Sequence, residues 1–303
     1  MEVPTGFIQT SAHGFLIITR PVYHKTAVAL AATDPEKALE AGVGPGPMQG
    51  RGGRLELPGH EGETLILKKK RRGGLYGKLR GDVYRDDYSA VSEVMLSETA
   101  WKKGVPVALL AFAMSAPAGP GRLASWRRGY SASIKLSGAR SLMECLGTPA
   151  SELPESQRRA MIRAAGAAVA RAHDRGFFHG DLNLGNILIV KSSQGEFGGW
   201  LIDLAHSTLG GTLLDRPRVK NLVRLYRSAE KWLPPSSPGE ARRRGRDVVR
   251  FLRAYVGKDR AAVRRLLSDA RRSRLSLLIH RLGWKATGAG AAGVRRSSVT
   301  AGR

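Results

Sequence analysis

The stretch HGDLNLGNILI, residues 179–189, sets Asp181 and Asn186 in a short polar break that leads into an apolar run. The stretch GWLIDLA, residues 199–205, follows after a polar, glycine-containing gap and carries Asp203. Short apolar runs separated by turn residues are typical of two strands joined as a hairpin. In such a hairpin the return strand would bring Asp203 beside Asn186. The pattern therefore predicts one site that holds all three side chains.

The spacing of these residues matches the needs of phosphoryl transfer from ATP. That reaction requires a carboxylate to orient the acceptor hydroxyl and take its proton, oxygen ligands for Mg²⁺, and a cation that positions the phosphates. Protein kinases meet the first two needs with an H-x-D-x-x-x-x-N loop and a second aspartate after the next strand. We therefore predict Asp181 as the catalytic base and Asn186 and Asp203 as Mg²⁺ ligands. His179 is interpreted as a brace for the loop backbone.

The cation on the phosphates should end a strand in the N-terminal half of the chain. The run LILKKK, residues 65–70, places Lys68 directly after an apolar triplet. Because side chains alternate along a strand, Lys68 and Lys70 would share one face and Lys69 would lie on the other. We favour Lys68 for the cofactor-binding role and keep Lys70 as the alternative.

The remaining nucleotide-binding residues are predicted from the segments on either side of that strand. A carboxylate partner for the lysine should lie on the helix expected at 86–103, where we favour Glu93 over Glu98. These two glutamates are five residues apart and so cannot share a helix face well. Gly50 and Gly52, just before the first strand of the pair, are the candidates for a glycine loop over the phosphates.

The composition predicts a folded protein with an anionic neighbour. The chain has 303 residues, a net charge of +25 and a hydrophobic fraction of 42%. A charge of this size indicates a polyanionic partner, either nucleic acid, a phosphate-rich substrate or an anionic membrane surface. The N-terminus has no basic leader, and the longest apolar run, at 105–114, is too short to span a bilayer. We expect a cytoplasmic protein whose membrane contact, if it has one, is peripheral.

The order of the expected elements predicts an α+β fold with a small, β-rich N-terminal half and a mainly helical C-terminal half. Strands are expected at 14–23, 50–57, 63–70, 105–114 and 130–136, and helices at 33–42, 86–103, 155–175 and beyond 217. The expected domains are an ATP-binding lobe at 1–137, a helical lobe with the catalytic loop at 138–284, and a disordered tail at 285–303.

Several stretches resemble the lipopolysaccharide core kinases, and most closely the 3-deoxy-D-manno-octulosonic acid (Kdo) kinases. They are KKKRRGGL at 68–75, GVPV at 104–107, HGDLNLGNILI with WLIDL at 179–204, and NLVRLYRSAEKWL at 221–233. The resemblance implies a protein-kinase-like fold of two lobes. It also implies ATP-dependent phosphorylation of a Kdo hydroxyl in the inner core of a lipid A-linked glycolipid, at the cytoplasmic face of the inner membrane.

The chain departs from this family's pattern at three places. The family usually has Asp-Phe-Asp at the second motif, and here Asp203 is followed by Leu and Ala. The strand position at Lys68 is often Arg in the family. The Arg-rich helices after residue 235 have no evident counterpart and are interpreted as an extension.

The basic residues suggest how such an enzyme would meet its substrate. Arg71 and Arg72 are candidates for contact with the substrate or the membrane. The stripe Arg242, Arg246, Arg250 and Arg253 is a candidate membrane-facing surface. Lys and Arg near an anionic leaflet each contribute about 1 kcal/mol to binding.

Two other functions remain open on the sequence. The acceptor can be heptose or a small molecule of the aminoglycoside type, although a cationic acceptor would require an acidic pocket, and Asp82, Asp86 and Asp87 form only a small acidic cluster. The chain can also be a basic nucleic-acid-binding protein on a kinase fold, but that role would not require the three intact polar residues of the loop. We expect no nucleic-acid partner.

Overall fold

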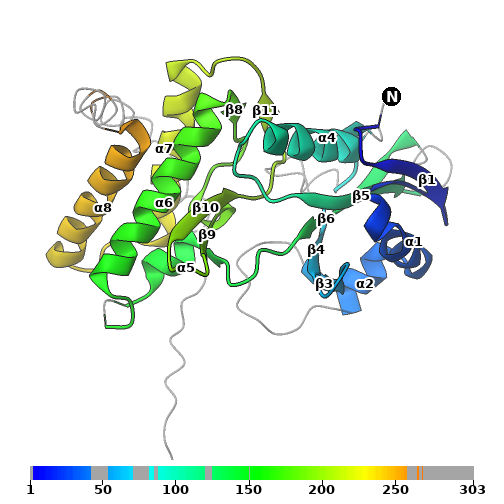
Figure 1. Cartoon of the computed structure of the whole chain (residues 1–303), viewed down its shortest axis with the longest axis horizontal. Coiled ribbons are helices and arrows are strands. Elements are labelled where there is room, and N and C mark those ends of the chain that lie inside the picture. The colour runs from blue at the N-terminus through cyan, green and yellow to red at the C-terminus, as the bar shows by residue number, and fades with distance from the viewer. Residues whose placement is uncertain are drawn as a thin grey trace, which may run out of the picture.

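The computed structural model describes residues 3–41, 54–70, 82–84, 88–119, 125–149 and 151–257, together with 265 and 268. The described chain forms a sheet-rich part, which holds the N-terminus, and a helical part beside it (Figure 1). This arrangement confirms the predicted α+β fold class. Several residues singled out by the sequence lie outside the described residues: Gly50, Gly52, Arg71, Arg72, Asp86, Asp87 and the tail at 285–303.

Among the described residues, the N-terminal half forms a six-stranded antiparallel sheet with the order β1-β2-β5-β6-β4-β3. Its strands are β1 (Ile8–Ala12), β2 (Phe15–Thr19), β3 (Arg54–Pro58), β4 (Thr64–Lys69), β5 (Leu110–Pro117) and β6 (Arg127–Ile134). β3 and β4 pair as the expected hairpin, with Leu55 opposite Leu67. β5 lies inside the sheet and is buried along almost its whole length, which agrees with its apolar sequence from Leu110 to Met114.

Helices cover both faces of this sheet (Figure 1). They are α1 (His24–Thr33), which follows the 3₁₀ turn η1 (Pro21–Tyr23), then α2 (Pro35–Ala41) and α4 (Tyr88–Lys102). Leu39 of α2 shares a buried cluster with Leu65 of β4 on one face. On the other face Val94 of α4 packs with Ile18 of β2. The face that α4 covers is the one that carries Lys68, because Lys68 alternates with the buried Leu65 and Leu67.

Two elements of the N-terminal half were missed by the sequence analysis. β1, with the sequence IQTSA, is a largely exposed edge strand that lacks a regular apolar alternation. α1 is rich in alanine, so its sequence shows no clear helical period of apolar residues. No side chain caps its N-terminus, so the sequence does not indicate where the helix begins. The strand expected at 105–114 begins only at Leu110, because residues 105–108 instead form a connection that bonds to the C-terminal half.

The C-terminal half is built around one long helix, α6 (Glu155–Asp174). The other elements are α5 (Leu142–Gly147), α7 (Asp215–Trp232), α8 (Pro238–Val256), η3 (Leu184–Asn186), and the short strands β7 (Arg140–Ser141), β8 (Phe177–Phe178), β9 (Ile187–Lys191), β10 (Phe197–Leu201) and β11 (Thr208–Leu209). The expected hairpin is confirmed, with Ile187 opposite Leu201. In the described part of the chain, no helix is both long and apolar enough to cross a membrane.

Glycine allows β10 to lie directly on α6. A Cβ atom at Gly199 would stand 2.7 Å from the carbonyl oxygen of Ala164 and 2.8 Å from the Ala168 Cβ. These separations are shorter than real Cβ contacts, so the strand could not approach the helix with a larger residue at this position. The close packing fixes the hairpin, and with it the position of the polar loop that precedes β9.

α8 is an integral part of the helical half and not an appended extension. A Cβ atom at Gly166 on α6 would stand 2.6 Å from the Phe251 carbonyl oxygen of α8, so the two helices approach closely. Arg158 of α6 donates to Asp247 of α8 from Nε at 3.0 Å and from NH2 at 2.9 Å, and both residues are buried. A buried ion pair is tolerated only where its partners are held in place. The interpretation of the helices after residue 235 as an extension is therefore wrong for α8.

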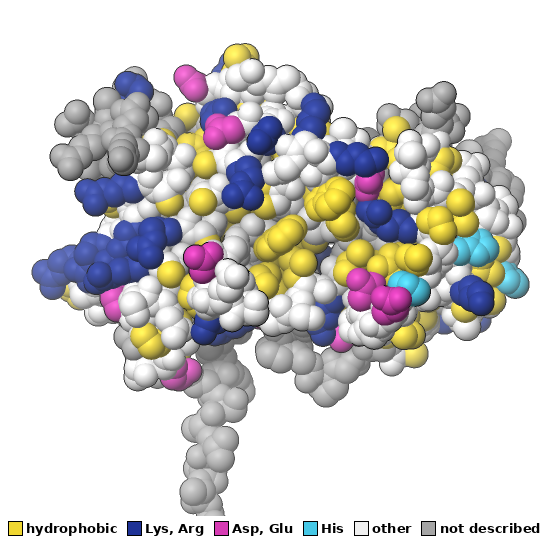
Figure 2. All heavy atoms as spheres, viewed as in Figure 1, with side chains coloured by type: hydrophobic (Ala, Val, Ile, Leu, Met, Phe, Trp, Pro, Cys, Tyr) yellow, Lys and Arg dark blue, Asp and Glu magenta, His cyan; other side chains and the backbone are white. Residues whose placement is uncertain are grey.

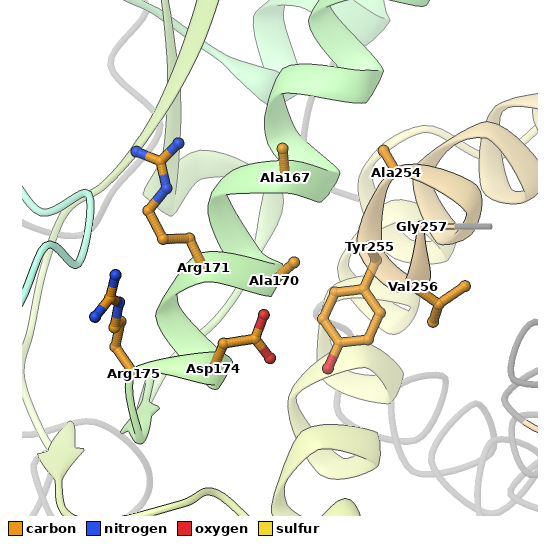
Figure 3. A pocket seen from close by; sticks show the side chains of 9 residues that line it. All are labelled: Ala167, Ala170, Arg171, Asp174, Arg175, Ala254, Tyr255, Val256 and Gly257. Atoms are coloured by element: carbon orange, nitrogen blue, oxygen red, sulfur yellow. The ribbon is translucent and has the colours of Figure 1, made fainter. Parts of the chain in front are cut away.

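A buried polar junction joins α6, α7 and α8. His173 on α6 and Asn221 on α7 are 1% and 0% exposed. The Nε2–H of His173 donates to Asn221 Oδ1 at 3.1 Å, and its Nδ1 accepts from the Tyr255 hydroxyl of α8 at 2.7 Å. Tyr255 extends from α8, near Asp174 of α6, at the edge of a hollow of about 670 Å³ between these helices (Figure 3). These partners suit a neutral imidazole, because one ring nitrogen must accept.

The junction predicts a specific loss of stability at mildly acidic pH. Burial lowers the pKa of His173 from 6.5 to about 4. Between these values the unfolded chain binds a proton that the folded chain does not, so the free energy of unfolding falls as the pH decreases below about 6.5. One pKa unit corresponds to about 1.4 kcal/mol, so His173 contributes a decrease of about 2 kcal/mol between about pH 6.5 and about pH 5.

Urea denaturation of the wild type and of the His173→Gln variant tests this expectation. The variant should be less stable near neutral pH, because it loses buried hydrogen bonds. The stability difference between the two proteins should then shrink by about 2 kcal/mol as the pH falls to about 5, since glutamine does not titrate. Stability curves that stay parallel over this range would show that His173 is not held neutral in the folded protein.

Candidate active site

The polar loop leaves β8 and passes under a tight backbone crossing. Gly180 is essential there, because a Cβ atom would stand 2.4 Å from the His206 carbonyl carbon and 2.7 Å from the Ala205 carbonyl oxygen. The N–H of Gly180 donates to the Ser207 hydroxyl at 3.0 Å. The loop is thus held against the segment that follows β10, which is the segment that carries Asp203.

His179 acts as the brace that the sequence predicts. Its ring Nε2–H donates to the Ile202 carbonyl at 3.0 Å, and its Nδ1 accepts from the backbone N–H of Asp181 at 3.1 Å. Burial lowers the pKa of His179, which agrees with a neutral ring that must accept at Nδ1. One imidazole therefore fixes the backbone at Asp181 and at the residue before Asp203.

The two asparagines of the loop have different tasks. Asn183 accepts at Oδ1 from the N–H groups of Gly185 and Asn186, which caps η3, and its Nδ2 lies 3.2 Å from Asp181 Oδ2. Asn186 donates from Nδ2 to the Asp181 carbonyl at 2.9 Å. That bond fixes the Asn186 amide and leaves its Oδ1 as the oxygen available to a metal.

Three side chains on one face of α7 contact the loop. Asn221 accepts at Oδ1 from the His179 N–H at 3.1 Å and donates from Nδ2 to the His179 carbonyl at 2.8 Å. Arg224 Nε lies 3.1 Å from Asp181 Oδ1. Ser228 accepts at Oγ from the Leu184 N–H at 3.2 Å. The sequence analysis quoted this stretch for its resemblance but assigned no role to these side chains, although their spacing of three and four residues places them on one helix face.

Asp203 is placed by the backbone around it. Leu201 donates to the Pro106 carbonyl at 2.7 Å and accepts from the Ala108 N–H at 2.9 Å, so the end of β10 is tied to the sheet-rich half. The next residue, Ile202, donates to the Asn186 carbonyl at 3.1 Å. Asp203 then adopts φ of 63°, a conformation that L-residues seldom use, and its side chain is exposed.

The ion pair next to this site is formed by Lys70 and Glu93. The Lys70 Nζ lies 3.4 Å from Glu93 Oε2, and the two side chains are only 12% and 10% exposed. Burial raises the pKa of Glu93, the charge of Lys70 lowers it, and the charge of Asp203 raises it again, so the charge of Asp203 acts on this pair. Glu98 instead pairs with Arg20. Of the two glutamates, Glu93 is therefore the one within ion-pair distance of Lys70.

The preference for Lys68 as the partner of Glu93 is wrong. Lys68 shares its strand face with Lys70, as strand alternation predicts, but Lys70 is the residue within ion-pair distance. The backbone of Lys70 still bonds to the Gly129 carbonyl at 2.8 Å, so the strand geometry continues one residue past the end of β4.

The donor set fits a hydrated magnesium ion. An asparagine oxygen and a carboxylate are hard ligands, and Mg²⁺ in nucleotide sites is typically held by one or two protein groups together with phosphates and water. Among the described residues, no group of three or more His, Cys, Asp or Glu side chains could hold a metal by itself. Asn186 and Asp203 are the residues that would contribute oxygens.

The chain is similar in sequence to known proteins. The family model described as "Lipopolysaccharide kinase (Kdo/WaaP) family" matches residues 47–255. A 3-deoxy-D-manno-octulosonic acid kinase from Haemophilus influenzae (strain PittEE) is 31% identical over 192 residues, 61% of this chain and 75% of that protein. The enzyme of the same name from Photobacterium damsela subsp. piscicida is 32% identical over 194 residues, 60% of this chain and 71% of that protein.

A solved structure confirms the predicted two-lobed, kinase-like fold. The structure titled "WaaP in complex with acyl carrier protein" is 21% identical, has a TM-score of 0.51, and is matched over 80% of this chain and 92% of its own. The family match extends to residue 255, and so includes α8 up to the tyrosine of the buried junction. The chain belongs to the lipopolysaccharide kinase (Kdo/WaaP) family, and it is a phosphotransferase with an alcohol group as its acceptor.

Proposed function

We propose that this chain transfers the γ-phosphoryl group of ATP to a hydroxyl of Kdo in the inner core of a lipid A-linked glycolipid. The observation that carries the proposal is the convergence of Asp181, Asn186, Asp203 and the Lys70–Glu93 pair on one site, although they come from both halves of the chain. The choice of acceptor is supported by the curated relatives, which are named Kdo kinases.

In this proposal each side chain has one task. Asp181 orients the acceptor hydroxyl and accepts its proton, and its carboxylate is held by Asn183 on one oxygen and by Arg224 on the other. Asn186 and Asp203 hold Mg²⁺, which when bound would neutralise charge on the phosphates. Lys70, kept in place by Glu93, binds the phosphates of the nucleotide. Gly50 and Gly52 remain the candidates for a loop over the phosphates and lie outside the described residues.

Phosphoryl transfer provides the direct test. Labelled γ-phosphate from Mg·ATP should appear in a Kdo-lipid A precursor with the wild type. It should fall by about 10²- to 10⁴-fold with the Asp181→Ala variant, because the general base is lost. Glu196→Ala serves as the matched control, since it removes an exposed carboxylate from the β9–β10 turn and should leave the rate unchanged.

The acceptor choice is judged in the same assay. Absence of label in the Kdo precursor, from a wild type that transfers phosphate to heptosylated core or to an aminoglycoside, would overturn the Kdo assignment. Equal transfer by the wild type and the Asp181→Ala variant would overturn the role of Asp181.

Lysine substitutions test the corrected ion pair. Lys70→Ala should raise the KM for ATP or lower kcat by about 10- to 100-fold in total, because a charge-assisted hydrogen bond of about 1.5–3 kcal/mol is removed. Lys68→Ala is the matched control on the same strand face and should have a small effect, within about 3-fold. The reverse order of the two variants would return the nucleotide-binding role to Lys68.

We propose further that the chain binds the cytoplasmic face of the inner membrane through α8. Arg242, Arg246 and Arg253 are exposed on this helix and border a hollow of about 570 Å³. Figure 2 shows dark blue side chains gathered at the edge of the molecule where α8 lies in Figure 1. Arg250, the fourth residue of the predicted stripe, is instead paired with Asp247 and Glu155. The membrane-facing charges are therefore the other three.

Vesicle binding tests this surface. Replacing Arg242, Arg246 and Arg253 together by Gln should weaken binding to phosphatidylglycerol vesicles by about 100-fold, from about 1 kcal/mol for each charge. Replacing Lys25, Lys37 and Lys191, which are exposed elsewhere, removes the same charge and should have much less effect. Equal losses in the two triple variants would show that net charge alone, and not α8, governs binding.

A further inference from the structure

The position of Arg224 shows a feature that the kinase-like loop pattern does not include. Its guanidinium lies 3.1 Å from Asp181 Oδ1 through Nε, and its NH1 group donates to the Gly180 carbonyl. The side chains of Arg224 and Asp181 are each 48% exposed. Two nitrogens of the guanidinium are therefore fixed to the loop, and about half of the arginine side chain remains open to solvent beside Asp181.

The loop itself supplies no cation at this point. Many protein kinases have a lysine two residues after the catalytic aspartate, and this chain has Asn183. The Asn183 side chain is engaged in capping η3 and in holding Asp181. Among the residues that the structure describes, Arg224 is the one basic side chain within ion-pair distance of Asp181. A cation is thus present beside the base, but it comes from α7 and not from the loop.

A structural role alone explains this ion pair poorly. Pairs between half-exposed side chains contribute about 0–1 kcal/mol to stability, because water screens them. The contact instead places a positive charge beside the carboxylate, where a second anion can bind it when Asp181 accepts the proton.

We propose that Arg224 is a catalytic residue that binds an oxygen of the transferring phosphoryl group. As the acceptor oxygen bonds to the γ-phosphorus, the bond from that phosphorus to the bridging oxygen breaks, and its electron pair leaves with ADP. The hydroxyl proton passes to Asp181, which becomes neutral. Arg224 loses its ionic partner in the same step in which charge spreads over the phosphoryl oxygens, and its N–H groups then donate to one of them. Arg224 itself gives up no proton.

The inference rests on the proposed function, because it requires Asp181 as the base. An anionic oxygen could also come from the acceptor, since Kdo carries a carboxylate. The two sources differ in kinetics. A group that binds the transferring phosphoryl in the transition state changes kcat, whereas a group that binds the acceptor carboxylate equally in both states changes the KM for the acceptor.

Steady-state kinetics of Arg224→Ala, Arg224→Lys and Lys220→Ala separate these roles. We expect Arg224→Ala to lower kcat by about 10²- to 10³-fold, with the KM values for ATP and glycolipid changed by less than about 3-fold. Arg224→Lys should restore part of kcat, because it keeps the charge but loses the planar fork. Lys220→Ala removes an exposed cation one turn earlier on α7 and should leave kcat unchanged.

Other results would overturn the inference. An unchanged kcat with a raised glycolipid KM would assign Arg224 to the acceptor carboxylate. An unchanged kcat with only a lowered thermal midpoint would make the ion pair structural.

Failure of the proposed function can be recognised separately. If the wild type does not label the Kdo glycolipid, the acceptor assignment fails, and Arg224 is then tested on the slow hydrolysis of ATP to ADP by the same wild type. Arg224→Ala should slow that hydrolysis as strongly, and an unchanged rate would refute the role of Arg224.

Discussion

The polar loop at 179–186 depends on the pair of hydrogen bonds between the Asn221 amide and the backbone of His179. At this point the chain has left β8 and has not yet begun η3, so no regular ladder satisfies its polar groups. Buried backbone groups without partners cost about 1–3 kcal/mol each. A fully buried asparagine provides a donor and an acceptor at once, and it fixes the residue from which the loop starts. His173 in turn orients the amide by donating to its oxygen.

This arrangement explains how distant helices set the geometry of the site. A continuous chain of hydrogen bonds runs from Tyr255 on α8 through His173, Asn221 and His179 to the Ile202 carbonyl, next to Asp203. Each histidine in this chain is neutral: it accepts through Nδ1 and donates through Nε2. α8 therefore stabilises the site through its buried face, while Arg242, Arg246 and Arg253 lie on its exposed side.

The sequence predicted the parts of the site that are local in the chain. The spacing of Asp181, Asn186 and Asp203, and the hairpin between them, follow from residues within a single segment of the chain. The sequence could not decide between two residues that share one face of a strand. Lys68 and Lys70 have the same parity, and only the position of Glu93, within ion-pair distance of Lys70, decides between them. Arg224 was missed for a related reason, because its partner is in the loop and the contact crosses from one element to another.

The site also separates its charges by depth. The buried side chains closest to the loop, His173, His179 and Asn221, carry no charge and make directional hydrogen bonds. The carboxylates of Asp181 and Asp203 lie at the surface, where water and substrate reach them. A charged group in the buried layer would need its own counter-ion and would change the field at the phosphates. Because a neutral layer holds the two carboxylates in place, the side chains under the loop add no charge to that of the largely buried Lys70–Glu93 pair.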